Sequence, residues 1–481
     1  MVNQRLKLLR QVFAGSVFAL TVFRAHGQLP GEGPRLGEDR ISQAEIESGV
    51  LSLHDIRSAG LKMFSTPFNK LDGYGDGPMD PMSPTEPGGR PTLGGNGSFL
   101  RVNGLDGQAC LECHTIVSNA SVPARLGIGG VGGGVSNAIF QPTIIDVNDS
   151  MNFGMAALDG RFINPPFLFG SGGIELLGKE MTAELQDLKQ FASDNPGLTV
   201  QLETKGVDFG ELVFTDGNFD YSGLEGIDQD LVVKPFGRKG EFATVRGFDE
   251  GAMMFHFGMQ PVEAVGEGID DDNDGVVNEI QIGEMSALVI FNTHLERPQE
   301  DLYSKSSTSS SRVFDRIGCA SCHKPFLATD SRYLTYSFPE VAEDPEANVF
   351  YESDLSQKPA GFTKTKRGGL MIRLFADLKR HYMGPELAET FGNPLDAEFT
   401  TARLWGVADT APYMHDGRAL TLGEAILMHG GEAQEARDQY VALPEQDKAK
   451  LLKFLMSLRT PLNPAADLTG DTRALSRDFR Q

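Results

Sequence analysis

Cysteine is scarce in this chain of 481 residues, which contains 4, and tryptophan occurs once. So few cysteines exclude a small scaffold held together by many disulfides. Basic residues are also in deficit, because 43 Lys and Arg face 66 Asp and Glu, for a formal net charge of −23. A field of that sign disfavours binding to nucleic acid or to an anionic membrane. It favours a basic protein partner, or it serves solubility alone.

Long apolar runs are absent except near the N-terminus. Residues 1–27 have the three parts of a secretory signal peptide: a basic start, an apolar stretch over 12–23 and a small-x-small site that ends at Gly27. The stretch is too short to span a bilayer comfortably, although an uncleaved anchor is the alternative. We expect the mature chain to start at Gln28, in the periplasm of a Gram-negative bacterium, with no membrane span.

All the cysteines fall in two copies of one motif, Cys-x-x-Cys-His. This motif is the attachment signature of c-type haem, in which the thiols form thioethers and the histidine ligates the iron. A redox Cys-x-x-Cys or half of a zinc site would explain one copy, but not two copies that are both followed by His. The sequence therefore predicts two covalent haem c groups. The six residues are Cys110, Cys113, His114, Cys319, Cys322 and His323.

The two motifs lie in different halves of the chain, which predicts an N-terminal haem domain over 28–303 and a C-terminal haem domain over 304–481. The serine-rich stretch 304–311 is typical of a linker. Helical spacing of apolar residues predicts helices over 181–192, over 281–295 and near the C-terminus. Residues 198–215 alternate apolar and polar side chains around Lys205-Gly206, which predicts a β-hairpin.

One acidic segment, Asp-Asp-Asp-Asn-Asp-Gly-Val-Val-Asn-Glu, is dense in oxygen ligands and ends at Glu279. Asp270, Asp272 and Asp274 stand at alternate positions before a glycine, as at the start of a calcium loop. Position twelve of the loop is Gln281 rather than Glu, so this is not a standard EF-hand. The segment predicts either a calcium site or an acidic surface loop.

The C-terminal third carries further motifs beyond the haem signature. They are Gly-Cys-Ala-Ser-Cys-His-Lys-Pro (318–325), His-Tyr-Met-Gly-Pro-Glu-Leu (381–387), Leu-Trp-Gly-Val (404–407), Ala-Pro-Tyr-Met-His-Asp-Gly-Arg (411–418) and Glu-Ala-Ile-Leu-Met-His-Gly-Gly-Glu-Ala (424–433). This series closely resembles the bacterial di-haem oxidoreductase family, within the wider group of di-haem cytochrome c peroxidases and MauG-type enzymes. The resemblance runs from about Leu105 to Leu458.

The resemblance implies a mainly α fold of two cytochrome c-like haem domains with long loops and a small β-hairpin. In this superfamily the N-terminal haem usually meets peroxide and the C-terminal haem relays electrons. The position of the sixth ligand to the C-terminal haem, a Met in related peroxidases, is occupied here by His429, with Met428 as the alternative. Imidazole in place of a thioether should lower the potential of that haem. His415 is expected to hydrogen-bond around this haem or at the face between domains.

The sixth ligand of the N-terminal haem stays open. His256 and Met259 share one short segment, His294 is a weaker candidate, and an open iron is the third option. Cleaving a peroxide O–O bond also needs a proton shuttle. The stretch that begins at Asp-Gly-Arg (159–161) resembles the family's distal segment, and the glutamate at its end, Glu175, is the predicted acid/base. Glu180 takes that role if the register shifts.

In the peroxidase and MauG branches a tryptophan that bridges the haems precedes this Asp-Gly-Arg, whereas here the position is Leu158. The single tryptophan, Trp405, either passes electrons near the C-terminal haem or is a core residue. The leading functional prediction is a periplasmic peroxidase that uses a small-molecule oxidant and a small redox-protein electron donor. The alternatives are a non-catalytic di-haem electron-transfer cytochrome and a MauG-like oxidase of a protein or organic substrate.

Overall fold

The computed structural model describes residues 32–80, 83–87, 107–114, 116, 139–146, 157–300, 307–389 and 396–470. The predicted signal peptide, residues 1–27, lies outside these ranges. Within them, no helix combines the length and the apolar character that crossing a membrane would require.

Short helices and many small sheets build the described part of the chain, with 35% of its residues in helices and 17% in strands. Seven sheets of two or three strands accompany 11 helices in the described ranges. The prediction of a mainly α fold is therefore wrong. Nine of the 16 described strands have three residues or fewer, which is too short for an alternating pattern of side chains to be recognised in a sequence.

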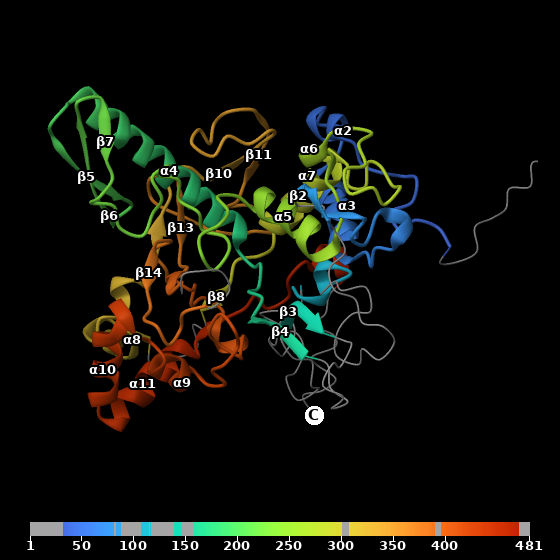
Figure 1. Cartoon of the computed structure of the whole chain (residues 1–481). Coiled ribbons are helices and arrows are strands. Elements are labelled where there is room, and N and C mark those ends of the chain that lie inside the picture. Colours follow the sequence, from blue (N-terminus) through green and yellow to red (C-terminus); the bar gives the residue numbers. More distant parts are fainter. Residues whose placement is uncertain are drawn as a thin grey trace, which may run out of the picture.

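Five helices of the first half gather near the first haem motif (Figure 1). Each of the first two begins at a capping box, in which a serine side chain and an acidic side chain three residues later bond each other's backbone N–H. α7 is buried on all sides, as expected of a helix that is apolar all round, and it confirms the helix predicted over 281–295. The five helices are α2 (Gln43–Glu47), α3 (Leu53–Ser65), α5 (Val245–Phe257), α6 (Val262–Val265) and α7 (Ile282–Thr293).

A long helix and a three-stranded sheet extend from this group (Figure 1). The helix α4 (Ser171–Asp194) contains the predicted 181–192 and starts ten residues earlier. Its first turn is rich in glycine, which suggests a loop in the sequence. In the fold these glycines permit close packing, because a Cβ at Gly172 would lie 2.3 Å from the Thr293 carbonyl oxygen. The sheet joins β5 (Thr199–Thr204), β6 (Val207–Thr215) and β7 (Asn218–Asp220), and the first two strands confirm the predicted hairpin.

The second half contains a small helical group, and a third apolar cluster lies among its helices. The helices are α8 (Ser307–Arg316), α9 (Leu422–Leu427), α10 (Gln434–Ala442) and α11 (Glu445–Leu455), whereas α12 (Ala466–Thr469) contacts α3 of the first half. α8 begins inside the serine-rich stretch, so the linker prediction is wrong from Ser307 onward. Packing of Val313 and Phe314 against α11 stabilises a helix that serine alone would not favour.

The remaining strands form two- and three-stranded antiparallel sheets. In the first half β1 (Met79–Asp80) pairs with β2 (Ser83–Pro87), and β3 (Ile139–Asp146) pairs with β4 (Ala157–Ile163). The strands that occur only in second-half sheets are β9 (Leu327–Ala328), β10 (Tyr333–Ser337), β11 (Val349–Asp354), β12 (Thr363–Lys364), β13 (Leu370–Ile372), β14 (Arg380–Tyr382) and β15 (Glu398–Thr400).

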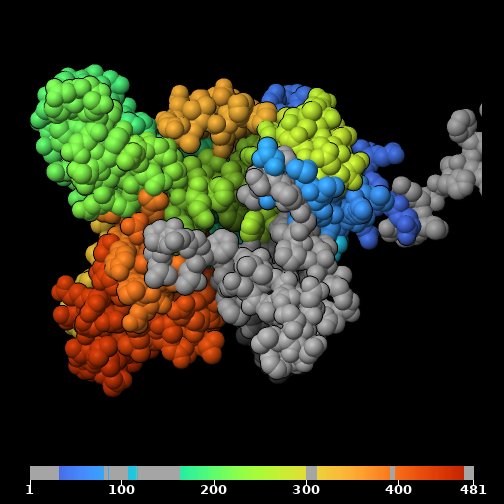
Figure 2. Space-filling view, in the orientation of Figure 1, coloured from blue at the N-terminus to red at the C-terminus, as the bar shows by residue number. Residues whose placement is uncertain are grey.

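The two halves of the chain share structure across the predicted domain boundary. β8 (Gln299–Glu300) pairs with β16 (Leu458–Arg459) near the end of the described chain. The largest apolar cluster combines residues of α4 and α7 with residues of β9, β10 and β13. Figures 1 and 2 show the orange strands β10 and β11 beside green α4. The division at residue 303 remains a prediction, and the main core extends across it.

Gly60 is where α3 meets α7 most closely, because a Cβ there would lie 2.1 Å from the Ala287 carbonyl oxygen. We expect Gly60→Ala to lower the free energy of unfolding by about 1–3 kcal/mol through overpacking. The matched control is Gly247→Ala in α5, where the nearest atom would lie at 3.6 Å and the helix should gain up to about 1 kcal/mol. Denaturant unfolding measures both; equal effects of the two substitutions would contradict the packing argument.

Candidate haem sites

Both Cys-x-x-Cys-His motifs fold into the same turn. Each starts with a 3-10 helix, Cys110–Glu112 in the first motif and Cys319–Ser321 in the second. The backbone N–H of the histidine donates to the carbonyl of the first cysteine, at 2.9 Å in the first motif and 3.0 Å in the second. None of the four cysteines takes part in a disulfide. One loop thus supplies two sulfurs and an imidazole, which is the donor set for covalent haem attachment.

In the second half, the imidazoles of His323 and His429 face each other, with ring centres 6.3 Å apart. Two imidazoles that share one metal ion through bonds of about 2.0–2.1 Å have ring centres about 6 Å apart. The Nδ1 atom of His323 lies 3.1 Å from the Phe375 carbonyl oxygen, and that of His429 lies 2.8 Å from the Ala425 carbonyl oxygen. A carbonyl only accepts, so Nδ1 carries the proton in each ring and Nε2 is left for iron. The residues present fit a six-coordinate haem.

Burial keeps both of these rings neutral. It lowers the pKa of His323 to about 4, with a further contribution from the nearby His429 ring. Burial likewise lowers the pKa of His429. Only the neutral imidazole has a lone pair to give to a metal, so the environment favours the ligating form.

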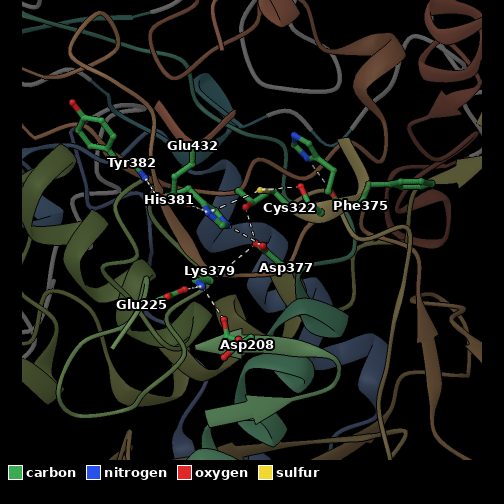
Figure 3. A network of polar contacts seen from close by, with 12 residues as sticks. Asp208, Glu225, Cys322, Phe375, Asp377, Lys379, His381, Tyr382 and Glu432 are labelled. Carbon is green, nitrogen blue, oxygen red and sulfur yellow. Dashed lines mark hydrogen bonds and ion pairs between the residues drawn. The ribbon is translucent and has the colours of Figure 1, made fainter. Parts of the chain in front are cut away.

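A polar network adjoins the second motif (Figure 3). His381 Nε2 lies 2.9 Å from Asp377, its Nδ1 lies 2.7 Å from Glu432, and the Cys322 sulfur lies 3.9 Å from the same Nδ1. Burial opposes a charge on His381, but the two carboxylates outweigh it and its pKa rises to about 11. Cys322, Asp377 and His381 are close enough to hold a metal ion. We assign the sulfur to haem attachment, which leaves His381 between the two carboxylates beside the second motif.

In the first half, His114 has the same kind of backbone partner. Its Nδ1 lies 2.7 Å from the Pro166 carbonyl oxygen, so the outward nitrogen is again free for a metal. Burial lowers the pKa of His114 to about 4, and the neighbouring His256 ring lowers it further. The sequence placed the segment containing Pro166 on the distal side of this haem, whereas the structure brings Pro166 to the proximal histidine.

The candidates for the sixth ligand of this haem separate in the fold. His256, in the last turn of α5, is an electrostatic neighbour of His114. Met259 is fully buried in an apolar cluster against which Cys110 packs. His294 lies elsewhere, with Nδ1 on the Ile290 carbonyl and Nε2 on the Ser353 hydroxyl. Both of its nitrogens are occupied, so His294 is a core residue and not a haem ligand.

Glu175, the predicted acid/base, is a residue of α4 that is 1% exposed and contacts the start of α5. One carboxylate oxygen accepts the backbone N–H of Val245, in the first turn of α5, and the other lies 2.9 Å from Lys179 Nζ. The alternative, Glu180, accepts the backbone N–H groups of Asp330 and Ser331. Both glutamates thus hold backbone in place, and Glu175 is the more deeply buried.

A second buried carboxyl, Asp249, was not found from the sequence. It lies in the middle of α5 and accepts a 2.9 Å hydrogen bond from Asn292 Nδ2. Burial raises its pKa to about 8, and the nearby Glu175 adds to that shift. Asp249 is also an electrostatic neighbour of Cys110. The helical spacing of Asp249 with Met253 and His256 was the available signal, because residues three or four apart share one face.

His415 lies away from the His323 ring in the described contacts. It stacks on Phe399 with ring centres 4.6 Å apart, and its Nε2 lies 3.6 Å from Glu389. Its backbone carbonyl accepts the N–H of Asn164 from the first half. Of the two roles expected for His415, this position favours the one at the face between the halves.

The acidic segment folds back on residues 73–79. Carboxylate oxygens of Asp270, Asp272 and Asp274 lie within 4.8 Å of one another, and Asp272 is fully buried. Beside them is Glu279, 2% exposed. Burial raises the pKa of Glu279 to about 9, and the three aspartates add to the shift. Burial and Asp274 raise that of Asp272 to about 6. The group has the geometry and the unbalanced negative charge of a calcium site.

Residues 359–458 match the model of a family described as "Di-haem oxidoreductase, putative peroxidase". This match covers the C-terminal part of the chain only and supports the predicted family placement. The predicted family is therefore confirmed. The match contains Phe375, His415 and His429, but neither Cys-x-x-Cys-His motif. The residues of the motifs carry the haem assignment by themselves.

Two curated relatives are named cytochrome-c peroxidase IdrP1. One, from Denitromonas iodatirespirans, is 30% identical over 176 residues, which is 34% of this chain and 43% of that protein. The other, from Pseudomonas sp. (strain SCT), is 27% identical over 158 residues, 31% of this chain and 38% of that protein. The chain thus spans less than half the length of the curated relatives it matches.

One solved structure, the hydrazine synthase of Kuenenia stuttgartiensis pressurised with xenon, aligns with 53% of this chain and 78% of its own at 15% identity. The TM-score is 0.26, too low for an argument about fold or function.

We predict that His429 holds the second haem in a low-spin state. Replacing it, His429→Ala, should open one axial position, and the electron paramagnetic resonance spectrum of the oxidised protein should gain a high-spin signal. Met428→Ala is the control and should leave the spectrum unchanged. A methionine–iron(III) absorption band that disappears in Met428→Ala would show that the neighbouring methionine is the ligand instead.

Proposed function

We propose that this protein is an exported di-haem c-type oxidoreductase that reduces hydrogen peroxide or a related oxidant at the N-terminal haem. Electrons would reach that haem through the C-terminal haem from a small redox protein. The observation that carries the proposal is the His323–His429 pair, whose two imidazoles would both bind the iron of one haem and so suit that haem to relaying electrons. The family assignment and the cytochrome-c peroxidase relatives support the peroxidase chemistry.

Haem at each motif would supply an iron that exchanges single electrons and, at an open position, binds an oxidant. Reducing hydrogen peroxide to two water molecules consumes two electrons and two protons. On the first-haem side, the described chain offers Glu175 and Asp249 as buried carboxyls to hold protons. The raised pKa of Asp249, about 8, keeps most of it protonated at neutral pH. Glu175 lies near Asp249, and its charge contributes to the raised pKa of Asp249.

The surface charge supports a basic donor protein, because a net charge of −23 attracts a cationic partner over long range. The N-terminal segment supports export to the periplasm, since covalent haem c is attached outside the cytoplasm. The basic donor protein is thus proposed from the net charge, and the peroxide oxidant is proposed from the family and the relatives.

Glu175→Gln should abolish peroxide turnover and leave both haems attached, because the amide cannot exchange a proton. Steady-state reduction of peroxide by a reduced donor measures the effect, with haem content checked by absorbance. Glu180→Gln, the same change one helical turn and a half further along α4, should retain turnover. Unchanged turnover in Glu175→Gln with loss in Asp249→Asn would move the proton shuttle to Asp249.

A carrier without peroxidase activity is the second candidate, favoured by the position of His256 beside His114. If both irons are six-coordinate, the oxidised protein shows two low-spin signals and no high-spin signal in electron paramagnetic resonance. An active peroxidase instead shows a high-spin signal at rest or after one haem has been reduced. The spectrum therefore separates the two functions before any substrate is known.

We also propose calcium in the segment that ends at Glu279. Calorimetric titration of EDTA-treated protein should show calcium binding that Asp272→Asn removes and that Asp271→Asn, the same change at the adjacent position, preserves. Absence of heat in the unsubstituted protein would dispose of the site.

The same carboxyls predict a pH dependence. The pKa of Glu279 rises from 4.5 to about 9 in the folded chain, so the folded state holds this proton more tightly than the unfolded state. Stability without calcium should therefore fall as pH rises from about 4.5 toward 9. Saturating calcium should reverse the trend, because it binds the ionised carboxylates. Thermal unfolding midpoints across this range, with calcium or with EDTA, measure both effects; parallel curves would contradict the proposal.

A further inference from the structure

We infer that Phe167 and Trp405 form the route by which an electron passes between the two haem units. The inference rests on the proposed function only in requiring a haem at each Cys-x-x-Cys-His motif. One electron leaves the reduced unit and arrives at the oxidised unit, and no bond or proton changes place. Neither aromatic side chain gains or loses charge in the net reaction.

The route begins at His114. Its Nδ1–H donates to the Pro166 carbonyl oxygen at 2.7 Å, and Pro166 is bonded covalently to Phe167. The Phe167 ring packs against both of the larger apolar clusters, the one that Cys110 joins and the one that contains Trp405. Phe167 thus links the surroundings of the first motif to the core shared by the two halves.

The link to the second half is a reciprocal contact of two aromatic rings with two glycines. A Cβ at Gly406 would lie 3.0 Å from the Phe167 ring, and a Cβ at Gly170 would lie 2.7 Å from the Trp405 ring. Both glycines have positive φ, +81° and +80°, a conformation that other residues rarely adopt. Each ring therefore lies directly against the backbone of the other segment, with no side chain between them.

From Trp405 the route continues along the backbone to the second motif. Three peptide units lead from Trp405 to Ala402, whose backbone, with that of Phe375, interacts with the His323 ring. Between the two histidines the path then consists of covalent bonds, the His114–Pro166 hydrogen bond, the contacts of the two rings with Gly406 and Gly170, and the approach of the Ala402 backbone to His323. Electronic coupling decays slowly along bonds and hydrogen bonds and steeply across gaps, so such a continuous path favours transfer.

Asn164 fixes this arrangement. Its side-chain amide donates to the carbonyls of Pro412 and Met414 at 2.8 and 2.9 Å, and its backbone N–H donates to the His415 carbonyl at 2.8 Å. Three bonds from one residue hold the 164–170 segment against the second half. The single tryptophan of this chain reaches the same junction from the second half, against Gly170.

The test uses the haem-loaded protein and needs no peroxide. Pulse radiolysis delivers one electron to the oxidised protein, and absorbance then follows the redistribution of the electron between the two haems. Phe167→Leu and Trp405→Leu should each slow this intramolecular rate, and the double variant should slow it by an order of magnitude or more. Phe362→Leu is the control. The Phe362 ring centre lies 6.4 Å from that of Trp405, but Phe362 is not part of the proposed route, so the rate of electron transfer between the haems should stay unchanged.

Potentials of both haems, from a spectroelectrochemical titration, separate loss of coupling from loss of driving force and should not move. If the leucine variants do not fold, Phe167→Met and Trp405→Phe keep more of the volume and should show the smaller decrease in the same order. A wild-type rate in a double variant with normal spectra would overturn the route. A protein with only one haem would overturn the route together with the proposed function, whereas the absence of peroxide turnover in a protein with two haems would contradict the proposed function alone.

Discussion

The hydrogen bond from a histidine Nδ1 to a backbone carbonyl is the interaction on which the rest of this structure depends. It occurs at His114, His323 and His429, with the carbonyls of Pro166, Phe375 and Ala425 as acceptors. In each case it fixes the tautomer and turns Nε2 toward the place of a metal. Burial lowers each pKa and keeps the rings neutral. The segments that supply these carbonyls are therefore part of the candidate haem sites.

Those segments also connect the two halves of the chain. Pro166 belongs to the segment that Asn164 anchors to the second half, and the main apolar cluster continues through Trp405. The two halves that carry the motifs are thus packed together and are not independent domains joined by a linker. The shared core explains how two equal motifs acquire unequal surroundings: one histidine faces another imidazole, whereas the other lies near a network of buried carboxyls that includes Asp249.

Much of the local structure could be predicted, and the reasons for the failures are physical. α7 and the β5–β6 hairpin carry clear periodicity and were predicted, because both are long enough to show it. The short strands were missed since two or three residues have no period. α4 begins earlier than predicted because its glycines, which suggest a loop, permit close approach to Thr293. Asp249 was missed because its importance comes from burial, which depends on neighbours distant in the sequence.

The sequence by itself predicted two haem-attachment motifs, the family and His429 as a candidate ligand, because these are carried by short motifs and fixed spacings. Tertiary structure decided which groups face those motifs. It removed His294 from the ligands, brought His256 toward His114, placed Pro166 on the proximal side and put Trp405 at the junction. These are contacts between segments far apart in the chain, and packing of the whole fold, rather than any local pattern, decides which of them form.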